Sequence, residues 1–433
     1  MNALELLRHY ESRNVTFMEQ DGSWPIVWQR AHGVYVWDDN GRKYLDLTAA
    51  FGVASAGHAN PGVVRAGQQQ MATLLHAMGD VHPHALKARL ARELSRMTFE
   101  RWGQAKVSKT RSHSAKTILC NSGFEAVEAA LKTAILATGK REVIAFTGAY
   151  HGLGYGALNA THREHFRSPF HSQLGDFGHF VAFPTTRREL AGTEKSIRHL
   201  LKSRSAGAIL VEPMQARGGI NIPPKQFLPL LRRLCDDYGA LLILDEIYTG
   251  FGRTGTWFAC EQSGIAPDLI CLGKALTGGF PLSACVGRAD VMDAAWPESS
   301  GEAIHTSTFL GHPVGCAMAL AQIAEIRRLK LVGRSKTLGN FVLVELAQLK
   351  SPALNLKTRG AGLMVGLELT HPDGSPATME SLTIIKRLLH LGYIFLPEGE
   401  HANVISFTPP LTITRVQLRS AVRALAAELR RFA

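Results

Sequence analysis

The sequence has 433 residues, of which 45% are hydrophobic and 19% are charged, with a formal net charge of +12. A chain of this length and composition can bury a large core, and we expect two or three lobes rather than one. No apolar run reaches the roughly 18–20 residues that a membrane-spanning helix needs. The segment Met1–Glu5 has neither the basic flank nor the apolar core of a signal peptide. These features predict a soluble, cytoplasmic protein.

The positive charge would permit contact with nucleic acid, a membrane surface or acidic ligands. Basic residues are dispersed along the chain, apart from the segment Lys106–Lys116, which has no aromatic residues to stack on bases. We interpret this segment as a solvated loop, and we expect neither a nucleic-acid nor a membrane partner. Six scattered cysteines form no Cys-x-x-Cys pair and predict reduced core residues rather than a metal site or disulfides; they are Cys120, Cys235, Cys260, Cys271, Cys285 and Cys316.

The first predicted element is a β-hairpin, in which the alternating segments 34–37 and 44–47 flank the turn Asp38–Gly41. From about residue 61 to 300, short apolar strands alternate with helices, and near-continuous apolar strands predict a mostly parallel sheet covered on both faces. We expect helices over 125–137, ending at Gly139, and over 227–238. The expected strands of this sheet are 117–120, 143–146, 208–211, 241–244, 269–272 and 284–286.

The last part of the chain has a different pattern. A long helical stretch around 312–349 is followed by strand patterns at 363–369 and 404–407, which suggest a smaller α+β lobe. We expect the N-terminal hairpin to pack with this lobe. The predicted fold class is α/β, with a small domain formed by residues 1–60 and 321–433 and a large domain formed by residues 61–320.

Ligands bind beyond the carboxyl ends of the strands in such sheets, and the first polar segment there is Cys120–Glu125, where a strand runs directly into a helix. Ser122 and Glu125 have the Ser-x-x-Glu spacing of a capping box. The same helix start could bind an anion, because its free backbone N–H groups and the helix dipole favour a phosphate. Both interpretations remain open for this segment taken alone.

Two further segments carry an acidic pair and a lysine. Asp245 and Glu246 follow the apolar strand 241–244, where they could bind a metal, act as a base or begin a turn. Lys274 lies between apolar residues and glycines in Leu272–Gly279, an unusual place for a side chain that is seldom buried without a partner. In isolation, a lysine whose amine reaches solvent is the simpler interpretation. A desolvated lysine, however, loses its proton more readily and can form a Schiff base.

The combination of these segments matches what pyridoxal phosphate (PLP) requires: a lysine for its aldehyde, a carboxylate for its ring nitrogen and a helix start for its phosphate. Asp245 would remain ionised and keep the ring nitrogen protonated. Lys274 would bind the aldehyde and, once displaced by the substrate, would move a proton from the substrate carbon. No metal is expected in such a site.

The sequence around these residues resembles the class III (ω-amino acid type) PLP-dependent aminotransferases. Asp245–Gly255 looks like the family's acidic and hydrophobic segment, and Pro267-Asp268 with Gly273–Leu282 is similar to its lysine motif in order and spacing. Gly57-His58 and Phe407–Leu411 extend the resemblance over nearly the whole chain. It implies a fold-type I PLP-dependent transferase that acts as a homodimer or a higher homo-oligomer, with active sites at the subunit interface.

The resemblance also implies roles for individual residues. Ser122 and Gly123 would hold the phosphate. Tyr150 would stack on the pyridine ring, Ile247 would contact its other face and Glu212 would lie beside it. Thr308 is similar to a threonine that reaches the phosphate of the neighbouring subunit. We interpret two histidines near these motifs as packing or supporting residues; they are His151 and His305.

Four positions depart from the family's usual pattern. Phe124 replaces a Ser or Thr, so one hydroxyl contact to the phosphate is lost while the backbone N–H remains. Tyr248 stands where many members have Gln. Leu153 and Ser406 stand where the members that use glutamate commonly have arginines, which form bidentate pairs with substrate carboxylates, and neither can supply that charge. Together with Phe51, the last three are the candidate substrate contacts.

We therefore expect an aminotransferase that moves an amino group from an amine or ω-amino compound to a small 2-oxo acid such as pyruvate. A PLP-dependent aminomutase, racemase or decarboxylase on the same fold is the main alternative. A binding protein without catalysis is disfavoured by the presence of both Lys274 and Asp245. A nucleic-acid-binding protein is disfavoured because no aromatic platform or helix-turn-helix pattern accompanies the charge.

Overall fold

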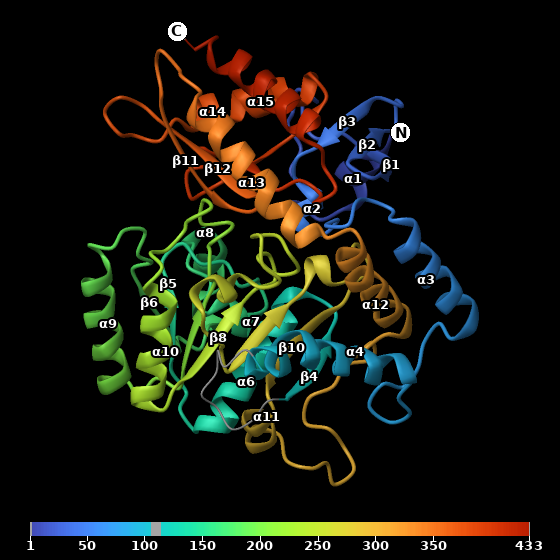
Figure 1. Cartoon of the computed structure of the whole chain (residues 1–433), viewed down its shortest axis with the longest axis vertical. Helices are drawn as coiled ribbons and strands as arrows, with labels where there is room; N and C mark the ends of the chain where they lie inside the picture. The colour runs from blue at the N-terminus through green and yellow to red at the C-terminus, as the bar shows by residue number, and fades with distance from the viewer. Residues whose placement is uncertain (1, 105–113, 433) are drawn as a thin grey trace.

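The computed structural model describes residues 2–104 and 114–432. Most of the basic segment 106–116, interpreted above as a solvated loop, therefore lies outside the described residues. Figure 1 shows a lower body built around a large sheet and an upper body that contains both ends of the chain. No helix in the described ranges is long and apolar enough to cross a membrane.

Within the described residues, a seven-stranded sheet with the order β4-β10-β9-β8-β7-β5-β6 forms the centre of the lower body. Neighbouring strands from β9 to β6 are parallel, and β10 runs antiparallel to both β4 and β9. This confirms the expected α/β class with a mostly parallel sheet. The strands are β4 Ala115–Cys120, β5 Val143–Phe146, β6 Gly178–Val181, β7 Ala208–Val211, β8 Leu241–Asp245, β9 Leu269–Leu272 and β10 Ser283–Arg288.

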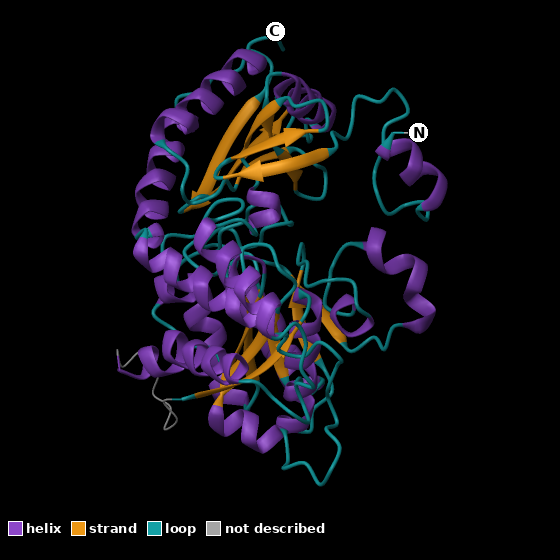
Figure 2. Cartoon of the chain, turned by 90° about the vertical axis from the view of Figure 1, so that its right-hand side faces the viewer, coloured by secondary structure: helices purple, strands orange, loops and turns teal. Residues whose placement is uncertain are grey.

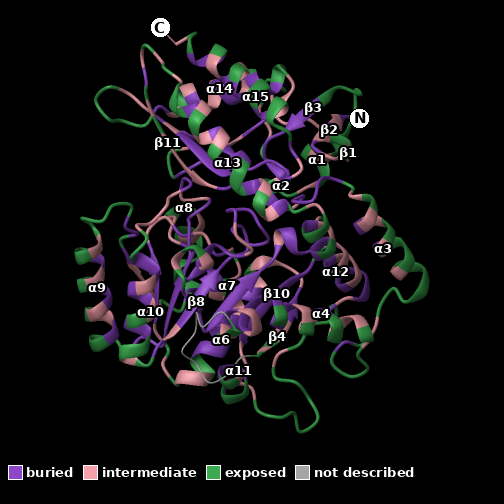
Figure 3. Ribbon diagram, viewed as in Figure 1, coloured by how far each residue is buried: buried purple, intermediate pink, exposed green. Residues whose placement is uncertain are grey.

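Successive side chains point to opposite sides of each strand, and both faces of this sheet are buried because a core cluster packs on each side. Ile144, Ile209 and Leu242 belong to the large core cluster that includes Phe227 of helix α10 (Phe227–Tyr238). Their neighbours along the strands face the opposite cluster, under helix α6 (Gly123–Thr138). Figure 3 shows the sheet as buried and the outer helices as partly exposed. The helix α6 ends at Gly139, as predicted, where a left-handed backbone with φ 65° stops the helical path.

The upper body contains two four-stranded sheets in the described residues, which Figure 2 shows in orange. The predicted hairpin is present, and its second strand pairs in parallel with a strand from the C-terminal part of the chain, so the hairpin does pack with that part. The other sheet is antiparallel, with the order β11-β12-β15-β14. The strands are β1 Trp28–His32, β2 Tyr35–Asp38, β3 Lys43–Asp46, β11 Asn355–Ala361, β12 Met364–Thr370, β13 Tyr393–Ile394, β14 Leu396–Glu398 and β15 Val404–Phe407.

The helical stretch expected around 312–349 is two helices, α12 (Pro313–Arg328) and α13 (Leu331–Ala347). Lys330 has a left-handed backbone with φ 52°, which an α-helix does not tolerate, and the chain turns there. We propose that the large and small domains divide near residues 61 and 320. The remaining α-helices are α1 Ala3–Tyr10, α2 Ala49–Gly52, α3 Pro61–Thr73, α4 Ala85–Ser95, α5 Arg101–Gln104, α7 Tyr155–Leu158, α8 Glu164–Arg167, α9 Leu190–Ser203, α11 Ala289–Ala295, α14 Thr378–His390 and α15 Arg415–Leu429.

Candidate active site

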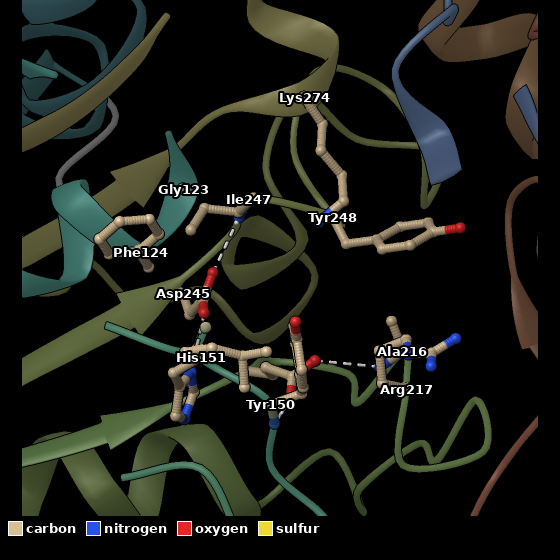
Figure 4. A pocket seen from close by; sticks show the side chains of 13 residues that line it. Gly123, Phe124, Tyr150, His151, Ala216, Arg217, Asp245, Ile247, Tyr248 and Lys274 are labelled. Atoms are coloured by element: carbon tan, nitrogen blue, oxygen red, sulfur yellow. Dashed lines mark hydrogen bonds and ion pairs between the residues drawn. The ribbon is translucent and has the colours of Figure 1, made fainter. Parts of the chain in front are cut away.

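A cavity of about 360 Å³ lies where β8 and β9 end and α6 begins. Its volume is in the range of small-molecule sites. Figure 4 shows that side chains from several different loops converge on it. Nine of the residues predicted from the sequence line this cavity: Gly123, Phe124, Tyr150, Leu153, Glu212, Asp245, Ile247, Tyr248 and Lys274.

Lys274 begins a short 3-10 turn two residues after β9 ends, with a left-handed backbone at φ 41°. Its amine nitrogen Nζ lies 4.8 Å from the centroid of the Tyr248 ring. Removal from water lowers the pKa of Lys274, although the negative charges of Asp245, Glu212 and Glu398 oppose this shift. The neutral amine is therefore more accessible here than in a solvated lysine.

Asp245 is the last residue of β8, and its side chain is buried. Its Oδ1 accepts a hydrogen bond from the backbone N–H of Ile247 at 3.1 Å, and its Oδ2 lies 2.7 Å from Nδ1 of His151. A carboxylate accepts, so Nδ1 of His151 carries the proton. His151 also lines the cavity. Its contact with Asp245 is what would make this histidine a supporting residue of the site.

The start of α6 does not form the capping box that the Ser-x-x-Glu spacing allows. Ser122 is the N-cap residue, but its hydroxyl makes no capping hydrogen bond. Glu125 Oε2 instead accepts the backbone N–H of Asn121 at 2.7 Å, one residue before the N-cap. The Ser122 hydroxyl oxygen is thus buried without a hydrogen-bond partner in the part of the chain that the structure describes. A free hydroxyl beside open helix N–H groups is suited to binding an anion.

Gly123 lies next to this hydroxyl and against Ile247. A Cβ atom at Gly123 would be only 3.1 Å from Cδ1 of Ile247. The glycine therefore allows the helix start and the end of β8 to approach each other closely.

Glu212 links two walls of the cavity. Its Oε1 accepts the backbone N–H of Tyr150 at 3.1 Å, and its Oε2 accepts that of Ala216 at 3.0 Å. Burial raises the pKa of Glu212 to about 7. Tyr150 in turn packs edge-to-face on Phe166, with 5.6 Å between ring centroids. Both carboxylate oxygens of Glu212 are thus already engaged by backbone donors.

The other predicted site residues do not line the cavity in this chain. Ser406 is buried in β15, where its hydroxyl donates to the carbonyl of Leu396. Phe51 is half-exposed in a segment of left-handed residues, beside Gly52, where a Cβ atom would lie 2.9 Å from the Tyr248 ring. Thr308 is exposed and does not line the cavity of its own chain.

Arg217, which was not predicted from the sequence, lines the cavity from the loop after β7. Its Nη1 lies 3.2 Å from Oε2 of Glu398 at the end of β14. The Arg217 carbonyl accepts a hydrogen bond from Nη2 of Arg163 at 2.6 Å. Burial raises the pKa of Glu398 to about 7. The sequence does show an arginine five residues after Glu212, but nothing in the local pattern indicates that this arginine faces a ligand.

A partly buried lysine and a buried aspartate lie at the carboxyl ends of adjacent parallel strands, beside a helix start suited to an anion, and this arrangement is typical of a fold-type I PLP-dependent enzyme. The family model of class III aminotransferases matches residues 16–429. This chain belongs to that family, and it is a transaminase that uses PLP.

Similar proteins agree with this assignment. An acetylornithine aminotransferase of Methanosarcina acetivorans is 35% identical, over 94% of this chain and 93% of the relative. A putrescine aminotransferase of Pectobacterium atrosepticum is 37% identical, over 90% and 80%. Among solved structures, an amine transaminase from an uncultivated Pseudomonas species, in a PLP-bound form, aligns with a TM-score of 0.86 at 27% identity, covering 98% of both chains.

The cavity fits PLP by its own geometry. The unpartnered hydroxyl of Ser122 and the start of α6 suit a phosphate, and Asp245 presents a buried carboxylate suited to a protonated ring nitrogen. Lys274 supplies the amine that the aldehyde needs, within the same cavity. These three groups come from three different loops and meet only because the sheet brings its strand ends together.

Proposed function

We propose that this aminotransferase moves an amino group from an amine or ω-amino compound to a small 2-oxo acid such as pyruvate. The donor C–N bond breaks and its carbon becomes a carbonyl, while the 2-oxo carbon gains the amino group and is reduced. The observation that carries the proposal is Leu153, which lines the cavity with its side chain 48% exposed. A donor meets an apolar surface there rather than a cation for its carboxylate.

The chain's own residues account for the proton movements. When bound, PLP supplies an electron-accepting ring and an aldehyde that carries the amino group. Asp245 would keep the ring nitrogen protonated, and His151 orients Asp245 through the 2.7 Å contact. Lys274, whose pKa burial lowers, takes a proton from the donor carbon at Nζ and returns one to the acceptor carbon.

The remaining predicted contacts position the cofactor. We propose that Ser122, Gly123 and the backbone N–H of Phe124 bind the phosphate. Tyr150 and Ile247 would contact the two faces of the ring, and Glu212 fixes the Tyr150 segment through its backbone contacts. The substrate end of the site is formed by Phe51, Leu153 and Tyr248, and Ser406 supports it from β15. This proposal is based on the family resemblance and on the position of Tyr248 beside Lys274.

We propose that the enzyme is at least a homodimer, in which Thr308 reaches the phosphate of the neighbouring subunit. Thr306 donates to Asp80 at 2.6 Å, so the segment of Thr308 lies beside the chain that follows α3. Both segments expose large apolar side chains, as expected of a subunit interface; these are Leu74, Leu75, Met78, Val81, Ile304 and Phe309. We also propose a cytoplasmic location, because all six cysteines are buried and free, as is usual in a reducing compartment.

The test is a two-substrate assay with purified holoenzyme. A panel of amines, ω-amino acids and α-amino acids, including glutamate, is supplied with pyruvate, and pyruvate consumption and alanine formation are followed. We expect amines or ω-amino compounds to drive alanine formation better than glutamate does. A preference for glutamate over every amine would overturn the proposal, and donor consumption without pyruvate consumption would indicate an aminomutase, racemase or decarboxylase instead.

A further inference from the structure

The guanidinium of Arg217 lines the cavity. Arg217 lies apart from the residues that we expect to bind the cofactor. Among the described lining residues, the other lysine or arginine is Lys274, to which we assign the cofactor. Figure 4 shows Arg217 on the same side of the cavity as the Tyr248 ring, away from Gly123 and Phe124 at the phosphate end. A simple amine donor has no use for a positive charge at the substrate end, whereas the carboxylate of a 2-oxo acid acceptor does.

The backbone of Arg217 is fixed on both sides. Its carbonyl accepts the bond from Arg163, and the preceding residue, Ala216, donates its N–H to Glu212. The side chain is less constrained, since it is 31% exposed. The loop therefore holds the position of Arg217 while leaving its guanidinium free to reorient.

Glu398 contacts the guanidinium of Arg217, but this contact is weak. Nη1 and Oε2 make a single contact at 3.2 Å, whereas strong charge-assisted pairs lie at about 2.7–2.9 Å and are often bidentate. Burial also raises the pKa of Glu398 to about 7, so this carboxyl can remain in its 2% exposed position as a neutral acid when the guanidinium leaves. A planar carboxylate ligand that binds both arms of Arg217 would thus replace a weaker contact with a stronger one.

We infer that Arg217 binds the carboxylate of the 2-oxo acid acceptor, and that Glu398 holds Arg217 when a substrate without a carboxylate occupies the cavity. This inference rests on the proposed function, because there the same cavity receives an amine and a 2-oxo acid in turn. A fixed unpaired cation would favour the acid and would be costly to desolvate against an apolar amine. The ion pair with Glu398 offsets this desolvation cost while the amine is bound, and it breaks when the 2-oxo acid binds Arg217.

The experiment compares two acceptors that differ in the carboxylate. Holoenzyme is supplied with one amine donor and either pyruvate or propanal, in the wild type and in Arg217→Met. We expect Arg217→Met to lower kcat/KM for pyruvate by about 10- to 150-fold, the worth of a charge-assisted bidentate pair, and to leave propanal unchanged. The control is Lys225→Met, which removes an exposed charge from the same connection outside the cavity and should alter neither acceptor.

A second variant and a binding measurement keep the test decisive. Arg217→Met/Glu398→Gln removes both charges, so it should fold even if the single variant is destabilised by an unpaired Glu398. Propionate cannot accept an amino group, and its binding is read as a perturbation of the cofactor absorbance. We expect both variants to lose this perturbation while the wild type and Lys225→Met keep it.

The outcomes separate this inference from the proposed function. Equal losses with pyruvate and propanal, or unchanged pyruvate use together with retained propionate binding, would overturn the role of Arg217 and leave the proposed function standing. Failure of the wild type to transfer an amino group from any amine to either acceptor would remove the proposed function and the inference with it. Selective loss with pyruvate, matched by loss of propionate binding, supports both.

Discussion

His151 contacts Asp245 directly, with Nδ1 2.7 Å from Oδ2 and both side chains buried. Because the backbone N–H of Ile247 donates to Oδ1, each carboxylate oxygen has one donor that fixes its direction. The imidazole thus orients the carboxylate of Asp245 and connects it to the segment that also carries Tyr150 and Leu153.

Asp245→Asn should reduce kcat/KM by orders of magnitude with nearly normal cofactor content. A neutral amide cannot keep the ring nitrogen protonated, whereas the phosphate and lysine contacts persist. Steady-state kinetics and cofactor absorbance measure the two effects. Asp236→Asn, which alters a carboxylate that is 64% exposed, is the matched control. Activity within about tenfold of wild type, or about 1.4 kcal/mol of barrier, would show that another group performs this role.

Several elements could be predicted residue by residue, because their apolar patterns are local. β7, β15 and α10 have the bounds expected from the sequence. The edge strand β6 was missed because Gly178–Val181 is only partly buried and lacks a continuous apolar run. The meeting of Asp245 with Lys274 followed from a general property of parallel sheets, which gather their functional loops at one edge.

The details of the site were less predictable, since they depend on side-chain direction and on distant contacts. Spacing alone could not show that Glu125 would bond Asn121 and leave the Ser122 hydroxyl free. The ion pair of Arg217 and Glu398 joins positions 181 residues apart, so no local pattern reports it.

Leu153→Arg should improve the use of glutamate as a donor. The side chain lines the cavity and is half-exposed, so an arginine can be accommodated there and can pair with a substrate carboxylate. We expect kcat/KM for glutamate to rise by about 10- to 150-fold, measured as alanine formed from pyruvate. Met379→Arg adds the same charge at a side chain that is 71% exposed and away from the cavity, and should have no such effect. Equal effects of the two substitutions would remove Leu153 from the substrate site.

Thr308→Ala should weaken cofactor binding in a way that depends on subunit association. Thr308 is exposed in this chain, and its proposed contact is to the phosphate of the neighbouring subunit. Cofactor content and sedimentation are measured across a dilution series, with Thr337→Ala on the exposed face of α13 as control. A monomer that binds cofactor fully would contradict both the contact and the proposed dimer.

The pH dependence of acceptor use should follow Glu398. Burial raises its pKa to about 7, so the carboxyl is mostly neutral below pH 7 and mostly ionised above it. The ionised form competes with the acceptor for Arg217, and the KM for pyruvate should therefore rise relative to that for propanal as pH increases through about 7. Other charged or titratable groups near Glu398 affect both acceptors and largely cancel in this ratio; they are Arg217, Arg163, Lys274, Glu212 and Tyr248.

Glu398→Gln should abolish this pH dependence and keep the ratio at its low-pH value. A ratio that changes with pH in the same way in Glu398→Gln would show that a different group titrates. A ratio that is constant in the wild type would show that Glu398 does not compete for Arg217.

The assignment of Lys274 supports every other role described for this site, and it can be tested directly. The holoenzyme is treated with borohydride, which fixes the bond between the cofactor and its lysine, and the labelled peptide is mapped by mass spectrometry. We predict the label on Nζ of Lys274, and we predict that Lys274→Ala takes no label and loses nearly all turnover with an unchanged circular dichroism spectrum. Labelling of another lysine, or turnover by Lys274→Ala with the absorbance of the wild type, would contradict the account.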